Sequence, residues 1–158
     1  MASRTKIPPA SLKQQVMNTR RAARSLARLS GEDRNRILLA ASEGIESRTA
    51  EILSANREDC EILAASAQQT SQALMKRLKT SEAGVREMAT RIRDVAALED
   101  PLSHTLGTTQ LDDGLTLYKV PCPLGVIAVI FESRPDVVPQ VGSLAIKTGN
   151  GLVLKGGA

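Results

Sequence analysis

The chain of 158 residues is poor in aromatic side chains and metal ligands and has no long hydrophobic run. It holds one Tyr, one Phe and no Trp, so the aromatic surfaces on which single-stranded nucleic acids stack are missing. One His and two Cys, Cys60 and Cys122, cannot supply a structural zinc site or a disulfide framework. No apolar stretch approaches the ~20 residues that a membrane-spanning helix requires. These absences favour a globular chain from a reducing compartment.

Charge is unevenly distributed along the chain. The formal net charge is +4, from 21 basic and 17 acidic residues, yet no acidic residue precedes Glu32. A transit peptide, a nucleic-acid-binding arm and a helix with a solvated basic face all have such a composition. The helical spacing of the less polar residues in this stretch favours the packed helix. These residues are Leu12, Val16, Thr19, Ala23 and Leu26.

Helical periodicity continues to about residue 100. The patterns predict four further helices, at residues 32–45, 50–67, 70–79 and 85–96. Gly31 is expected to end the first helix, and Glu32 and Asp33 to lie near the positive N-terminus of the second. Asp100-Pro101 is expected to end the last, because proline disfavours a helical residue before it.

The pattern becomes β-like after Pro101. Residues 103–114 form a polar stretch with a turn signal at 112–114, and residues 115–120 alternate weakly, as a strand would. Residues 126–131 and 152–154 are apolar, β-branched runs, which are typical of strands buried on both faces of a parallel sheet. A helix over 137–147 is expected between them. Asp136 is its expected N-cap, Pro139 lies in its first turn, and residues 148–151 end it.

Strand, helix and strand in about thirty residues predict one right-handed βαβ crossover. Two inner strands need neighbours that these residues do not contain, so we expect the chain to be the N-terminal part of a longer protein. The expected division is a helical segment over 1–100 and the incomplete start of an α/β cofactor-binding domain over 101–158, with the catalytic domain absent. The predicted fold class is therefore α/β.

Two loops are candidates for a ligand site, because ligands of open parallel sheets bind beyond the carboxyl ends of the strands. The first contains Ser133, Arg134, Pro135 and Asp136. In one interpretation Arg134 holds a phosphate or carboxylate. In the other the loop only caps the helix, and Arg134 pairs with Glu132. The second loop is Lys155-Gly156-Gly157. Its lysine can reach a ribose or phosphate and its glycines allow close approach, or it is only a turn with a solvated lysine.

No cysteine–histidine pair is proposed by the spacing. Cys60 falls within a helical pattern as a small packed side chain, and Cys122 lies between two prolines before the first buried strand. His104, the only histidine, falls in the polar loop and is expected to be solvated. Neither G-x-G-x-x-G nor G-x-x-x-x-G-K-[ST] occurs, so the ordinary dinucleotide and Walker fingerprints are absent.

The order of four short segments resembles the γ-glutamyl phosphate reductases (glutamate-5-semialdehyde dehydrogenases), a family in the aldehyde dehydrogenase superfamily. These segments are Pro123-Leu124-Gly125-Val126-Ile127, Phe131-Glu132-Ser133-Arg134-Pro135-Asp136, Lys147-Thr148-Gly149-Asn150 and Leu154-Lys155-Gly156-Gly157. Upstream, Ala55-Asn56-Arg57-Glu58-Asp59, Arg77-Leu78 and Leu98-Glu99-Asp100-Pro101 fit the family as well. The resemblance covers nearly the whole chain and argues against a transit peptide.

The resemblance implies N-terminal helices followed by the first βαβ of an aldehyde-dehydrogenase-like, Rossmann-type cofactor domain. It implies a cytoplasmic enzyme of proline biosynthesis, which reduces L-glutamate 5-phosphate to L-glutamate 5-semialdehyde with NADPH and releases phosphate. It places Lys155, Gly156 and Gly157 at the cofactor, and Ser133 to Asp136 at the substrate and nicotinamide. Many bacterial members have Asn where this chain has Asp136, and an Arg where it has Lys155.

The family's catalytic cysteine forms a thioacyl intermediate and lies in a later domain, so neither Cys60 nor Cys122 takes that role. The resemblance thus implies that this chain alone is inactive. The complete enzyme is expected to form a homo-oligomer and to bind neither nucleic acid nor membrane. Two alternatives stay open: a non-catalytic helical module that uses its basic first helix to bind an acidic partner, and a superfamily member with another substrate, such as a CoA-acylating dehydrogenase.

Overall fold

Residues 11–65 and 72–156 are described by a computed structural model, in which six helices and four strands form an α/β arrangement. The helices of the first hundred residues are α1 (Leu12–Leu26), α2 (Gly31–Ser47), α3 (Thr49–Ala65), α4 (Gln72–Leu78) and α5 (Glu82–Ala97). The remaining elements are β1 (Gly107–Asp112), β2 (Leu115–Lys119), β3 (Val126–Ile130), α6 (Val137–Lys147) and β4 (Gly151–Lys155). The expected helices are confirmed within a few residues, but residues 66, 67, 70 and 71 lie outside the described part.

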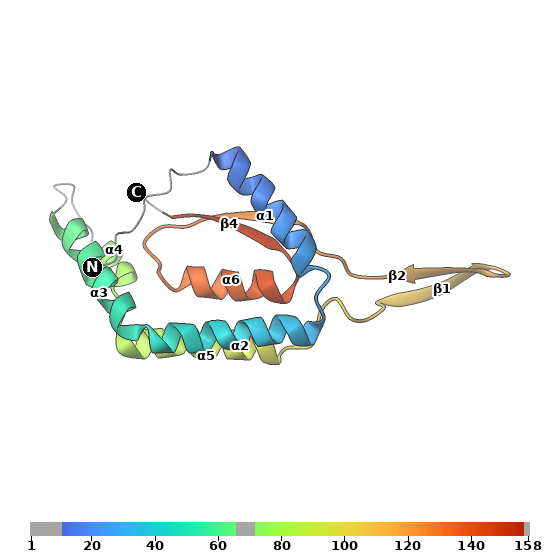
Figure 1. The fold of residues 1–158 in the computed structure, drawn as a ribbon, viewed down its shortest axis with the longest axis horizontal. Coiled ribbons are helices and arrows are strands. Elements are labelled where there is room, and N and C mark those ends of the chain that lie inside the picture. Colours follow the sequence, from blue (N-terminus) through green and yellow to red (C-terminus); the bar gives the residue numbers. More distant parts are fainter. Residues whose placement is uncertain (1–10, 66–71, 157–158) are drawn as a thin grey trace.

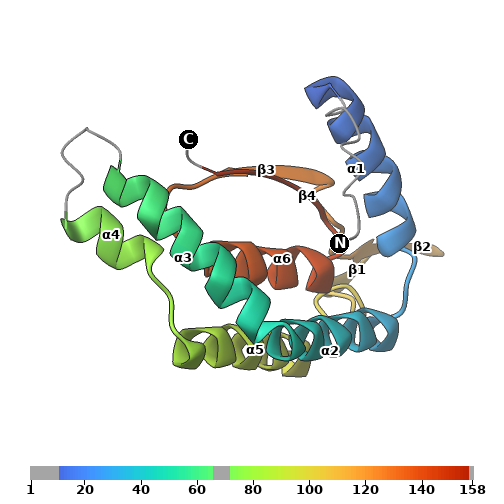
Figure 2. The ribbon, with the colours of Figure 1, turned by 60° about the vertical axis from the view of Figure 1, so that its left-hand side comes forward.

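The parallel pairing of β3 with β4 confirms the βαβ prediction. Val126 is opposite Gly151 and Ile130 is opposite Lys155. Figure 1 and Figure 2 show α1 on one side of this two-stranded sheet and α6 on the other, with α2 and α5 beyond α6. The sheet therefore lies between α1 and α6.

The core joins the helices of the first hundred residues to α6. Leu38 of α2 and Ile92 and Ala96 of α5 form a buried cluster, against which Ile146 of α6 packs. Leu38 is fully buried, which removes its whole side chain from water and contributes about 2 kcal/mol. The apolar faces of these helices thus pack against one another. Residues from both expected segments, 1–100 and 101–158, contribute to this core.

The strands are less buried than the sequence predicts. The apolar run predicts burial on both faces, but 83% of Ile130 is exposed. Among the described strands each has a single neighbour, so each leaves an edge open, and α1 covers the Gly151 end rather than the Ile130 end. Gly151 lies so close to α1 that a Cβ there would approach Thr19 Cγ2 to 2.8 Å. The described residues alone therefore leave the strands only partly buried, and the predicted burial on both faces is not reached without further neighbours.

Two local predictions are corrected as well. Gly31 begins α2 instead of ending α1, because Ser30 accepts a hydrogen bond from the Asp33 N–H and so caps α2. Residues 107–112 form strand β1 instead of an irregular polar stretch. Antiparallel pairing with β2 across the Asp113–Gly114 turn, where Gly114 has φ 76°, supplies the backbone hydrogen bonds that the polar side chains do not suggest.

The β1–β2 hairpin stands away from the rest of the fold (Figure 1). Every residue of both strands is exposed, including Leu111, Leu115, Leu117 and Tyr118.

In the described residues no helix is long and apolar enough to cross a membrane.

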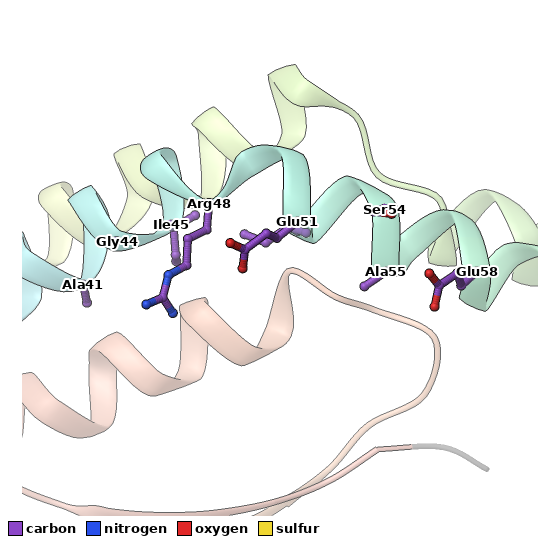
Figure 3. Close-up of a pocket in the computed structure, with 9 residues that line it drawn as sticks. Ala41, Gly44, Ile45, Arg48, Glu51, Ser54, Ala55 and Glu58 are labelled. Atoms are coloured by element: carbon purple, nitrogen blue, oxygen red, sulfur yellow. The ribbon is translucent and has the colours of Figure 1, made fainter. Parts of the chain in front are cut away.

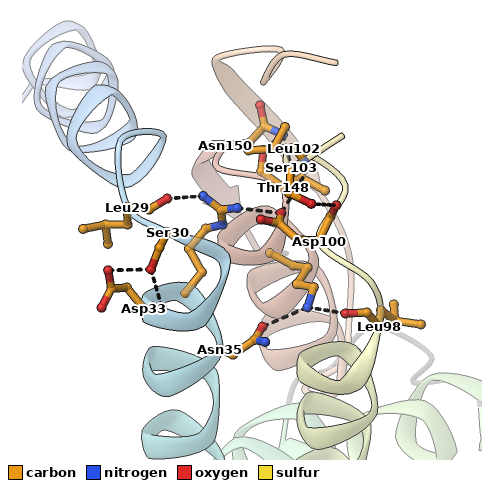
Figure 4. A network of polar contacts seen from close by, with 12 residues as sticks. Leu29, Ser30, Asp33, Asn35, Leu98, Asp100, Leu102, Ser103, Thr148 and Asn150 are labelled. Carbon is orange, nitrogen blue, oxygen red and sulfur yellow. Dashed lines mark hydrogen bonds and ion pairs between the residues drawn. The ribbon is translucent and has the colours of Figure 1, made fainter. Parts of the chain in front are cut away.

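A polar network fastens the βαβ unit to the helices (Figure 4). Lys147, at the end of α6, is only 2% exposed and donates to Asn35 Oδ1 at 2.8 Å, to Ala96 O at 2.9 Å and to Leu98 O at 2.5 Å. Asn150 accepts a hydrogen bond from the Gly125 N–H at 2.9 Å, just before β3. These bonds fix the loops at the amino edge of the sheet.

Candidate functional site

The loops that follow β3 and β4 meet at the carboxyl edge of the sheet. The Phe131 N–H donates to Lys155 O at 3.0 Å, which extends the ladder one step beyond the last strand pair. A Cβ added at Gly156 would lie 3.9 Å from Phe131 Cζ, and among the described residues other than its chain neighbours no other heavy atom lies within 4 Å. Ligands of open α/β sheets bind at this edge. The two candidate loops therefore begin side by side at this edge.

Lys155 and Gly156 provide hydrogen-bond donors at this edge. Lys155 is exposed, and its Nζ donates to the Gly156 carbonyl oxygen. An ammonium beside open glycine backbone suits the hydroxyl and phosphate oxygens of a dinucleotide. The residues present thus fit the NADP that the resemblance implies. Gly157, the third residue of this prediction, lies outside the described residues.

The Ser133 to Asp136 loop turns sharply before α6. Ser133 has φ 49°, a left-handed conformation that residues other than glycine rarely adopt. Arg134 Nη2 lies 3.1 Å from Asp136 Oδ2, and the Val137 N–H donates to Arg134 O at 3.2 Å. The alternative in which Arg134 pairs with Glu132 is therefore wrong, and the partner is Asp136.

Asp136 does not cap α6 as predicted. Its backbone is already helical, with φ −67° and ψ −21°, and its side chain makes no capping hydrogen bond. An N-cap residue needs an extended backbone to turn its side chain back onto the free N–H groups. The carboxylate instead faces Arg134 and, at 4.0 Å, Arg91 of α5.

Arg91 is a residue that the sequence patterns do not single out. It lies 45 positions before Asp136, on helix α5. No local signal connects the two residues, because α5 reaches the loop only through its packing on α6 and α2. Pro135 and Asp136 face a cavity that is lined on its other side by α5 and by the segment before it.

A larger hollow of about 870 Å³ runs along α2 and α3, where Figure 3 shows Arg48, Glu51 and Glu58 projecting from the same side of the helices. None of the predicted site residues lines it, so we do not take it as the functional site. Cys60 is half-buried in α3, and Cys122 is exposed shortly before β3, at the amino edge of the sheet. His104 is exposed, as expected.

No protein-family model matches the chain. The γ-glutamyl phosphate reductase of Methanosarcina mazei is 46% identical over 149 residues, which are 93% of this chain and 33% of that protein. The one from Synechococcus elongatus is 47% identical over 146 residues, with 92% of this chain and 33% of that protein covered. The chain thus spans about a third of the length of these relatives.

Solved structures give the same result. The crystal structure of γ-glutamyl phosphate reductase from Saccharomyces cerevisiae superposes with a TM-score of 0.85 at 38% identity, covering 94% of this chain and 37% of that one. The enzyme from Thermotoga maritima superposes with a TM-score of 0.84 at 30% identity, covering 94% and 35%. The chain is therefore homologous to the N-terminal portion of the γ-glutamyl phosphate reductases, and this confirms the family resemblance.

Proposed function

We propose that this chain forms the N-terminal part of a cytoplasmic enzyme that reduces L-glutamate 5-phosphate to L-glutamate 5-semialdehyde with NADPH, a step of proline biosynthesis. The observation that carries the proposal is the identity of 46% with a γ-glutamyl phosphate reductase over 93% of the chain. The joined loops at the carboxyl edge of the sheet support it, because a nucleotide and a small acidic substrate need such an edge.

In this proposal, Lys155, Gly156 and Gly157 hold the ribose and phosphate region of the cofactor, and Ser133 to Asp136 face the substrate. When bound, NADPH supplies a hydride. The exposed Lys155 ammonium contributes a positive charge to the cofactor's phosphates, and the open space around Gly156 lets the nucleotide approach the backbone. Arg134 and Asp136, paired at 3.1 Å, orient one another on the substrate side.

Neither cysteine of the chain acts as the nucleophile in this proposal. Cys122 lies before β3, at the edge opposite to Lys155, and Cys60 is half-buried within α3. We expect no turnover from the 158-residue chain alone, because an acyl phosphate has to be attacked by a nucleophile positioned at the cofactor.

The test is steady-state kinetics of the enzyme expressed from the complete reading frame, followed as NADP⁺ reduction in the presence of the semialdehyde and phosphate. Lys155→Ala is expected to raise the KM for NADP⁺ about tenfold, the usual effect of losing one charge-assisted hydrogen bond, with a smaller effect on kcat. Lys13→Ala, an equal charge change on the exposed side of α1, serves as the control. Lack of wild-type activity with this substrate would overturn the proposed function.

The complete enzyme is further proposed to be a homo-oligomer. The hairpin supports this, because an isolated two-stranded hairpin is marginally stable in water and this one exposes Leu117 and Tyr118. Sedimentation equilibrium of the complete enzyme tests the point, and a monomer at micromolar concentration would contradict it.

A further inference from the structure

A cavity of about 170 Å³ lies between the loop after β3 and the start of α5. It is lined by Arg77, Lys79, Thr80, Gly84, Glu87, Met88, Arg91, Pro135 and Asp136. Pro135 and Asp136 belong to the loop at the carboxyl edge of the sheet, so the cavity opens beside the region where ligands of such sheets bind. Its other wall comes from residues more than forty positions earlier in the chain.

The backbone of that wall is held in place by a buried amide. Asn56 of α3 is 7% exposed, donates to Leu78 O at 2.9 Å and accepts from the Thr80 N–H at 2.9 Å. Lys79 lies between these two anchored residues. Gly84 lets Thr80 approach α5, because a Cβ at Gly84 would lie 2.6 Å from Thr80 Oγ1. The backbone of this wall is therefore held in place by contacts within the chain, without a bound ligand.

The charges that line the cavity are of both signs, and they differ in how they are paired. Arg91 lies 2.6 Å from Glu87 and 4.0 Å from Asp136. Arg77 and Lys79 are exposed, and the side chain of neither makes a hydrogen bond or ion pair with another described residue. The lining therefore includes two cationic side chains without a partner among the described residues, together with two carboxylates that are paired with arginines.

We infer that this cavity binds the α-amino acid end of the substrate, with Arg77 and Lys79 at its α-carboxylate and with Asp136 and Glu87 accepting from its α-ammonium. The inference rests on the proposed function and extends it to the recognition of the substrate. A phosphate group would need cations alone, and the two carboxylates would repel it. A zwitterionic head group needs cations and carboxylates in one site, and side chains of both signs line this cavity.

Binding of the α-carboxylate and binding of the phosphate can be measured separately when the reaction is run toward the acyl phosphate. In that direction the semialdehyde, which carries the α-carboxylate, and inorganic phosphate are independent substrates. In the complete enzyme, the double substitution Arg77→Gln/Lys79→Gln is expected to raise the KM for the semialdehyde about tenfold to a hundredfold. The KM values for phosphate and NADP⁺ are expected to change less than about twofold.

The matched control is the double substitution Arg28→Gln/Lys76→Gln, which removes the same charge from exposed positions outside the cavity. It is expected to leave all three KM values unchanged. A rise in the KM for phosphate instead would assign the cations to the phosphate and overturn the inference, and an unchanged KM for the semialdehyde would overturn it as well. In both cases the wild-type enzyme stays active, whereas an inactive wild type would remove the proposed function and this inference together.

A second variant checks that the wall is preorganised. Asn56→Ala leaves every cavity charge in place but removes both anchors of Lys79, so the KM for the semialdehyde is expected to rise with little change in the KM for NADP⁺. Equal changes in both KM values would show general loss of structure and contradict the positioning role of Asn56.

Discussion

Arg34 and Asp100, 66 residues apart, form a 2.6 Å ion pair at the junction between the helices and the βαβ unit. The Arg34 side chain is 2% exposed, and its Nη1 also donates to Leu29 O at 2.6 Å (Figure 4). The Leu102 N–H donates to the same Asp100 carboxylate at 3.1 Å. This pair therefore ties the start of α2 to the segment that leaves α5.

Asp100→Ala is expected to lower the free energy of unfolding by roughly 3 kcal/mol, because it leaves the buried Arg34 guanidinium without its counter-charge. Urea unfolding followed by circular dichroism measures the change. Glu87→Ala, which removes an exposed ion pair with Arg91, is the control and is expected to cost about 0.5 kcal/mol. Equal losses in the two variants would show that the Arg34 pair is no stronger than a surface pair.

Acid is expected to destabilise the fold through Asp100. Burial raises the pKa of this carboxyl, but the hydrogen bonds from the Leu102 N–H and the Arg34 guanidinium lower it more, so its pKa lies below the ordinary value of 3.8. A carboxyl with a lowered pKa contributes stability that is present above its unfolded pKa and lost as the pH falls through its folded pKa. The free energy of unfolding should therefore fall as the pH drops below about 4.

The pKa of Asp33 is lowered as well. The Ser30 hydroxyl and then the Arg36 guanidinium lower its pKa, but its side chain is only partly buried and its partner Arg36 is exposed. Unfolding curves between neutral pH and the acid range, compared for Asp100→Asn and Asp33→Asn, separate the two. The first variant should have the flatter pH dependence, and a flatter curve for the second would contradict the assignment to Asp100.

Most of the regular elements, β1 excepted, were predictable because their signals are local. The β-branched run at 126–131 and the glycine at 149, which has φ 68°, specify a strand and a helix end without reference to the rest of the chain. The N-caps Ser30 and Ser81 also act locally, since each accepts from an N–H three residues on, but neither was among the expected caps.

The buried charges and the wall of the candidate site were not predictable in this way. No sequence pattern singled out Arg34 or Lys147 as buried, because their acceptors come from segments many residues away. Asp136 reads as a helix cap, and only the packing of α5 against α6 brings Arg91 to it. Sequence periodicity fixes which face of a helix is buried, but not which charged side chain the next helix will meet.

Lys147→Met tests the buried ammonium directly. The substitution keeps most of the aliphatic stem but leaves Asn35 Oδ1, Ala96 O and Leu98 O without their donor, and an unsatisfied buried acceptor is costly. The free energy of unfolding is expected to fall by about 2 kcal/mol. Lys76→Met on the exposed face of α4 should change it by less than about 0.5 kcal/mol, and a neutral Lys147→Met would contradict the network.

The docking of α1 on β4 depends on the absence of a side chain at Gly151. A Cβ there would come within 2.8 Å of Thr19 Cγ2 and 3.0 Å of Ala23 Cβ, so Gly151→Ala must push the helix away from the strand. A loss of roughly 1 to 3 kcal/mol is expected from such overpacking, with faster amide hydrogen exchange in α1 than in α2 or α5. Gly44→Ala in α2 is the matched control, because nothing lies within 4 Å of its added Cβ. It should stabilise the chain by about 0.5 to 1 kcal/mol, since alanine has the higher helix propensity. Stabilisation by both substitutions would mean that α1 does not rest on Gly151.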